Sequence, residues 1–197
     1  MENIGSKMSD DVELGDILDL AMRRYWAFYL FLIVNLANFF YWFSPLYDES
    51  SPVQFRIQSA VVIFLFALPY LLMAMRAPRR YIAPVAVLAL PDLVLAVVYL
   101  ADRDSSLIVG FDLIVTLLSV AAPIALAVMA RNKYLRFGAV AMIVIALVSF
   151  VWSAFASPII FNMGAVALFA AFNILTIIAS VVAFASIAIG LYREFIR

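Results

Sequence analysis

Residues 81–101 read YIAPVAVLALPDLVLAVVYLA, an apolar run interrupted by a single acid, Asp92. A helix that rises about 1.5 Å per residue needs roughly 20 apolar residues to cross the hydrocarbon core of a bilayer. Charged residues bound the run, with Arg79 and Arg80 before it and Asp102 after it. The stretch therefore predicts a transmembrane helix that carries a carboxylate near its centre.

The same apolar pattern recurs along the whole chain of 197 residues, of which 68% are hydrophobic and 13% charged, with mean hydropathy +1.10. Soluble domains are about half apolar and a quarter charged. The predicted spans are 25–45, 58–75, 81–101, 107–130, 137–157 and 162–192. We therefore expect an all-α polytopic integral membrane protein, a bundle of six transmembrane helices (25–197) behind an N-terminal segment (1–24). The last run is the longest and should tilt.

The basic residues predict the orientation. If both termini are cytoplasmic, 11 of the 13 basic residues lie on the inner side and only Arg56 and Arg103 on the outer side. This asymmetry is typical of membrane proteins, in which Lys and Arg favour the cytoplasmic side. Tyr and Trp near the predicted span ends agree with it. The predicted location is the bacterial cytoplasmic (inner) membrane, with the N- and C-termini inside.

The chain contains neither cysteine nor histidine. It therefore lacks thiolate ligands, cysteine nucleophiles, and the side chain that most often ligates haem or zinc and acts as a base near neutral pH. We expect no cofactor, no bound metal and no nucleic-acid partner. The expected surroundings are the lipid bilayer, with protein partners or further copies of the chain within the membrane as candidates.

The N-terminal segment predicts a short amphipathic helix. Ser9 is a suitable N-cap, and Leu14, Ile17, Leu18, Ala21 and Tyr25 follow the spacing of one apolar helix face. Asp16 and Asp19 lie off that face, and Asp19 can pair with Arg23 one turn later. One interpretation is a helix that lies along the membrane surface. The other is a docking helix for a partner, with Leu14, Ile17, Leu18, Asp16 and Asp19 as contact residues.

Two acids fall within predicted spans, Asp92 at mid-membrane and Asp112 near the outer end of the fourth span. A charged Asp at the bilayer centre costs about 2.5–3.5 kcal/mol on insertion scales, so it should face the bundle interior, be protonated, or bind a cation. Pro91 withholds a backbone donor and predicts a kink that leaves a carbonyl near Val87 unpaired. The structural alternative is that each acid only hydrogen-bonds a neighbouring helix.

Uncharged polar side chains recur at helical spacing in several spans. Asp112, Thr116 and Ser119 share one face, as do Asn173, Thr176 and Ser180, and as do Asn35 and Asn38. Such stripes face the interior of a bundle, where they line a polar path or form interhelical hydrogen bonds. Small residues four apart, such as Ser186 and Gly190, predict close helix packing.

Three functions are compatible with these features. The first is a transporter or an ion or proton pathway that uses Asp92, lined by Asp112 and the polar stripes. The second is a non-catalytic accessory or assembly subunit of a larger membrane complex. The third is an enzyme that resembles intramembrane aspartyl proteases, whose Gly-x-Gly-Asp motif is matched incompletely by Val109-Gly110-Phe111-Asp112. Because that match is incomplete and no Pro-Ala-Leu motif follows, the chain is not expected to be an enzyme.

Overall fold

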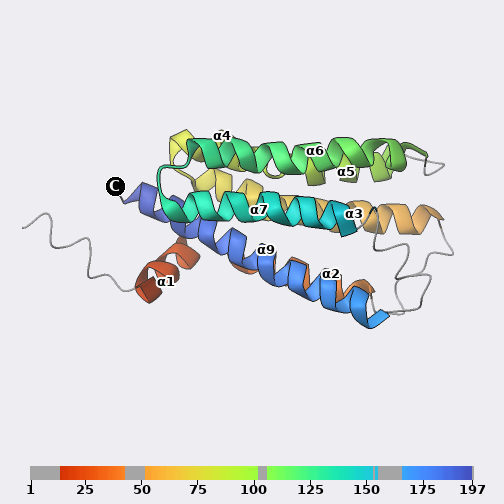
Figure 1. Cartoon of the computed structure of the whole chain (residues 1–197), viewed down its shortest axis with the longest axis horizontal. Coiled ribbons are helices and arrows are strands. Elements are labelled where there is room, and N and C mark those ends of the chain that lie inside the picture. The colour runs from red at the N-terminus through yellow and green to blue at the C-terminus, as the bar shows by residue number, and fades with distance from the viewer. Residues whose placement is uncertain (1–13, 43–51, 102–105, 153, 155–165, 197) are drawn as a thin grey trace, which may run out of the picture.

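The computed structural model describes residues 14–42, 52–101, 106–152, 154 and 166–196, with side chains for 15–40, 56–101, 113–152, 154 and 167–196. Every regular element in these residues is a helix (Figure 1), which confirms the all-α prediction. The elements are α1 (Leu14–Arg24), α2 (Ala27–Trp42), α3 (Pro52–Arg76), the 3₁₀ turn η1 (Arg79–Tyr81), α4 (Ile82–Val87), α5 (Leu90–Ala101), α6 (Ser106–Met129), α7 (Lys133–Val151) and α9 (Val166–Phe195).

Four helical stretches of the described residues are long and apolar enough to cross a membrane: Arg56–Arg76, Arg79–Ala101, Lys133–Val151 and Ala167–Phe195. Ala27–Phe40 and Leu113–Met129 are equally apolar but shorter over the residues searched. Large apolar side chains such as Phe40, Met75 and Val128 are exposed on the outside of the bundle. A surface of this kind fits lipid rather than water, so the chain is an integral membrane protein.

The helices pack in chain order around a common interior. Packed pairs are α2 with α3, α3 with α5, α5 with α6, α6 with α7, and α7 with α9, and α9 returns to α2 to close the ring. Figure 1 shows α6 and α7 nearly parallel, whereas α9 crosses them obliquely. A closed ring matters for function because it surrounds an interior that side chains from many helices can line.

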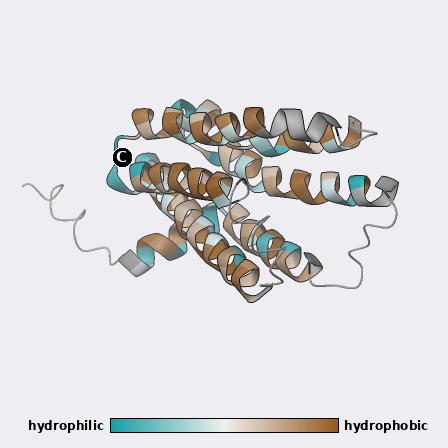
Figure 2. Cartoon of the chain, turned by 45° about the vertical axis from the view of Figure 1, so that its right-hand side comes forward, coloured by the Kyte–Doolittle hydropathy of each residue, from teal (hydrophilic) through white to brown (hydrophobic). Residues whose placement is uncertain are grey.

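The two ends of the bundle differ. We call the end that carries α1, the α6–α7 turn and the C-terminus the α1 end, and the opposite end the far end (Figure 1). Hydrophilic residues gather mainly at the α1 end in Figure 2. The largest fully buried side chains lie in its half of the bundle, among them Tyr25, Tyr81, Leu126, Leu135 and Leu191. This half is therefore filled by an apolar core.

Arginines at the α1 end bind the carbonyl ends of helices. Arg24 and Arg76 donate to each other's backbone carbonyls, at 3.4 Å and 2.8 Å. Arg80 donates to the carbonyl of Met129, the last residue of α6, at 2.9 Å. A cation at a helix C-terminus satisfies an orphan carbonyl and complements the helix dipole. These hydrogen bonds link the end of α1 to the end of α3, and η1 to the end of α6.

Close backbone contact joins α7 and α9. A Cβ added at Gly190 would lie 2.6 Å from the backbone nitrogen of Leu135, and one added at Gly138 would lie 2.7 Å from the carbonyl oxygen of Ala183. The amide of Asn132 caps α7 through the Leu135 nitrogen and also donates to the Gly190 carbonyl at 2.9 Å. The small-residue spacing at Gly190 therefore predicted a real helix crossing.

Candidate functional site

The predicted span 81–101 is broken immediately before Asp92. Helix α4 ends at Val87, and the amides of Leu88 and Ala89 bond to carbonyls only three residues earlier. Regular α-helical bonding resumes when Leu93 donates to the Ala89 carbonyl at 3.0 Å. Pro91 explains the break, because its ring has no N–H and clashes with the preceding turn. The kink predicted from Pro91 is confirmed, and it places Asp92 in the first turn of α5.

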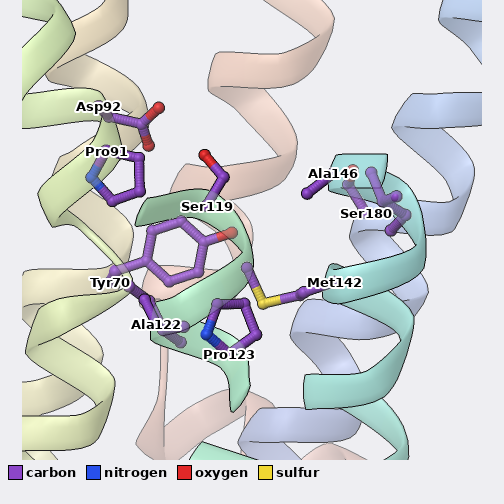
Figure 3. Close-up of a pocket in the computed structure, with 11 residues that line it drawn as sticks. Tyr70, Pro91, Asp92, Ser119, Ala122, Pro123, Met142, Ala146 and Ser180 are labelled. Carbon is purple, nitrogen blue, oxygen red and sulfur yellow. The ribbon is translucent and has the colours of Figure 1, made fainter. Parts of the chain in front are cut away.

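Asp92 lines a cavity of about 200 Å³ inside the helix ring. Figure 3 shows its carboxylate beside Ser119 of α6 and Tyr70 of α3, with Met142 of α7 and Ser180 of α9 across the space. The lining side chains thus come from α3, α5, α6, α7 and α9. Five helices converge on one small volume that contains a single carboxylate among the described lining residues.

The Asp92 carboxylate has no hydrogen-bond or ion-pair partner among the described residues, and no Lys or Arg is among the described side chains that line the cavity. The side chain is half-buried. Its position in the first turn of α5 lets the helix dipole favour a negative charge. That dipole offsets only part of the cost of an unpaired carboxylate at membrane depth. The arrangement therefore favours uptake of a proton or a small cation.

Two prolines that line the cavity withhold the usual helical hydrogen bond from a backbone carbonyl four residues earlier. Pro123 lies inside α6 and lines the cavity, and it cannot donate to the carbonyl of Ser119 four residues earlier. Pro91 likewise cannot donate to the carbonyl of Val87. Broken or proline-interrupted helices are known to supply carbonyl oxygens to cations in transporters. The described lining of the cavity thus offers a carboxylate and the hydroxyls of Tyr70, Ser119 and Ser180, and hard cations prefer oxygen ligands of this kind.

A second cavity, of about 220 Å³, lies between α2 and α9. Its polar lining residues are Asn35, Asn38, Asn173, Thr176 and Ser180. Ser180 lines the first cavity as well, so the two spaces adjoin at this side chain. We call them the Asp92 cavity and the amide cavity. The structure therefore brings the predicted stripes of the first and last spans together at one place.

The polar stripe residues bond to their own helices. Asn35 donates to the Phe31 carbonyl, Ser119 to Val115, Asn173 to Phe169 and Thr176 to Phe172, all at 2.8–2.9 Å. These donors do not form the interhelical bonds that the structural alternative required. Their oxygen atoms keep acceptor capacity toward the cavities, since a hydroxyl or amide oxygen accepts independently of the donor.

Not every predicted site residue joins the cavities. Thr116 lies in α6 and is half-buried, but it is not among the residues that line either space. Asp112 belongs to α6, and its side chain lies outside the described residues, as does that of Leu14 in α1. The sequence analysis missed Tyr70 because it treated tyrosines only as markers of span ends. Its position beside Pro69 in the middle of an apolar run was the available signal.

An aromatic cluster borders the Asp92 cavity. The rings of Phe31 and Phe184 stack with centroids 4.5 Å apart, and Tyr70 lies edge-on to Phe31 at 5.8 Å and tilted against Phe184 at 5.3 Å. Phe184 is fully buried, and Phe31 and Tyr70 are nearly so. The cluster joins α2, α3 and α9, and it belongs to the same apolar core that fills the α1 end.

Part of the predicted docking face is occupied by the chain itself. Ile17 and Ala21 are buried against Ile189 of α9, whereas Leu18 remains exposed. The predicted pair of Asp19 with Arg23 is confirmed, with a nitrogen–oxygen distance of 2.9 Å. Asp16 is exposed. Helix α1 is therefore anchored on the bundle by Ile17 and Ala21, whereas Asp16, Leu18 and Asp19 of the predicted docking residues remain exposed.

No group of three or more acidic, cysteine or histidine side chains that could hold a metal ion occurs in the described part of the chain. Comparisons with protein-family models, curated proteins and solved structures found no match to this chain.

Proposed function

We propose that this protein is a small membrane transporter or ion pathway in which Asp92 carries a proton or a small cation. One observation carries the proposal: a half-buried carboxylate, unpartnered among the described residues, faces a cavity lined by five helices at the start of a broken span. An acid that only joined two helices would show a hydrogen-bond partner on the second helix. Intramembrane acids at broken helices commonly mark ion or proton paths.

The proposal includes the membrane topology. In it α2, α3, the α4–α5 pair, α6, α7 and α9 all span the bilayer, and the α1 end faces the cytoplasm of a bacterial inner membrane. The described basic residues support this orientation. The α1 end holds Arg23, Arg24, Arg76, Arg79, Arg80, Arg131, Lys133, Arg136 and Arg193, while Arg56 lies near the far end and bonds to the carbonyls of Tyr99 and Leu100. This agrees with the preference of Lys and Arg for the cytoplasmic side.

The accessory-subunit alternative receives less support from the geometry. One of its supports is α1 as a docking helix, and Ile17 and Ala21 of that helix are buried on the chain's own α9. An accessory subunit also has no need of an unpaired acid in an interior cavity.

Flux measurement tests the proposal. The purified chain is reconstituted in liposomes, a potassium diffusion potential is imposed with valinomycin, and proton entry is followed with an enclosed pH-sensitive dye, with sodium entry measured in parallel. We expect flux of one of these ions above that of empty liposomes, and its loss in Asp92→Asn. Asp16→Asn, which changes an exposed acid of α1, is the matched control and should conduct as the unmodified chain does. Equal flux in Asp92→Asn and the unmodified chain would overturn the proposal.

A further inference from the structure

The amide cavity has a lining of distinct chemistry. None of its described lining residues is charged, and its polar groups are three carboxamides and two hydroxyls. Phe39 and Phe169 add apolar surface to the same space. An ion placed there would lose its hydration without meeting an opposite charge, which is costly. The cavity therefore suits an uncharged occupant with both hydrogen-bonding and apolar parts.

Asn35 shows that this space is built to meet a polar group. The residue is only 7% exposed, and its amide nitrogen is used by the Phe31 carbonyl at 2.8 Å. Its carbonyl oxygen makes no hydrogen bond within the described residues, and it belongs to a side chain that lines the cavity. This oxygen can accept a hydrogen bond from a molecule in the cavity, because an amide oxygen accepts independently of what its own amide nitrogen donates to.

We propose that the amide cavity binds a small uncharged solute that carries carboxamide or hydroxyl groups on an apolar body. Each Asn side chain offers both a donor and an acceptor, and a carboxamide or hydroxyl group on the solute answers both. Because Ser180 lines both cavities, this solute would lie across the Asp92 cavity from the carboxylate. The inference rests on the proposed function in that it assigns the solute to the same pathway, with the ion at Asp92 as its companion.

The absence of cysteine from the chain allows a direct test with one introduced thiol. Thr176→Cys is close in size and puts the thiol on the cavity wall. The rate of its modification by N-ethylmaleimide is measured in reconstituted, full-length protein with benzamide, benzoate or benzylammonium present. These probes share one ring and differ in charge. Gly15→Cys, at an exposed position on α1 where an added Cβ meets no side chain or other helix within 4 Å among the described residues, is the control thiol.

We expect benzamide to slow modification of Thr176→Cys saturably, and the two charged probes to leave the rate unchanged. The rate should fall about tenfold when benzamide reaches ten times its dissociation constant, because about one-eleventh of the sites are then empty. Modification of Gly15→Cys should not respond to any probe. Equal protection by the charged probes, or none by benzamide, would overturn the inference.

A second substitution, made in the Thr176→Cys protein, tests whether benzamide protection of the thiol depends on the Asn side chains of the amide cavity. Asn38→Leu changes a half-buried position and should weaken protection, and Asn35→Leu should abolish it in any preparation that remains folded. Ser186→Ala removes a hydroxyl of α9 that bonds only to the Val182 carbonyl and lines neither cavity, so it should leave protection intact. Protection that survives both Asn substitutions would contradict the assignment.

The two proposals fail in different ways. Benzamide protection together with ion flux that is unchanged in Asp92→Asn would overturn the proposed function and leave the solute site standing. Ion flux that depends on Asp92, without benzamide protection, would overturn the solute site alone.

Discussion

At the scale of single residues, the chemistry centres on Asp92. The sequence places this acid in the middle of an apolar run, and Pro91 predicts the kink that the structure shows at Leu88 and Ala89. Which groups surround the carboxylate could not be predicted, since this depends on the order of helices around the ring. Ser119 was predicted as a polar stripe residue and Tyr70 was not, yet both lie on the cavity that holds Asp92.

Substitution of Asp92 should separate stability from activity. Asp92→Asn removes a charge that has no described partner, and we expect the free energy of unfolding to rise by up to about 3 kcal/mol. The check is the midpoint of thermal unfolding in detergent, with Asp16→Asn as the control that changes little. If the Asp92 carboxylate instead stabilised the bundle through a hydrogen bond to a neighbouring helix, the midpoint of thermal unfolding of Asp92→Asn would fall.

At the scale of elements, the sequence predicted which stretches form helices more accurately than it predicted the residues at which those helices begin and end. The predicted span 58–75 begins earlier in the structure, at Pro52, and the predicted span 137–157 is a helix over Lys133–Val151. Asn132 explains the second start, because its side chain accepts from the Leu135 nitrogen as an N-cap. Hydropathy responds to apolar content, whereas a helix end is fixed by capping bonds, so the two boundaries differ.

The crossing of α7 and α9 yields a stability prediction. Gly190→Ala would place a methyl group 2.6–2.8 Å from backbone and Cβ atoms of Leu135, and these backbone atoms cannot rotate away. We expect a loss of about 1–3 kcal/mol in the free energy of unfolding, typical of overpacking. Thermal unfolding of the purified variant checks this value.

Gly15→Ala is the matched control for that substitution, since nothing lies within 4 Å of the added Cβ. It should leave the unfolding midpoint unchanged or slightly higher, as alanine favours helix. Equal midpoints for the Gly190 and Gly15 variants would show that α7 and α9 do not approach as closely as described.

At the scale of the whole molecule, composition was enough to predict a helical membrane protein, because a chain this apolar cannot cover itself with polar surface. Composition and spacing could not predict that the helices close into a ring, or that the stripes of α2 and α9 meet around the amide cavity. Those features follow from tertiary packing at small residues and aromatic rings. The sequence alone left both the transporter and the accessory-subunit functions open, because it does not show which polar side chains meet in the folded bundle.

The proposed topology predicts which side of the membrane each link faces. Single thiols in this cysteine-free chain at Arg131, in the α6–α7 turn, and at Ala101, at the end of α5, should lie on opposite sides. In spheroplasts, a membrane-impermeant maleimide should modify Ala101→Cys at once and Arg131→Cys only after lysis. Modification of both before lysis would contradict the topology.

The central claim, that the carboxyl group of Asp92 takes up a proton or a cation inside the bundle, is tested most directly by infrared difference spectroscopy of the reconstituted protein. Spectra are recorded while pH is changed, and again while sodium replaces a large organic cation, for the unmodified chain and for Asp92→Asn. We predict a carboxyl band that responds to one of these changes and is missing in Asp92→Asn. A spectrum in which the substitution removes no responsive band would contradict the account.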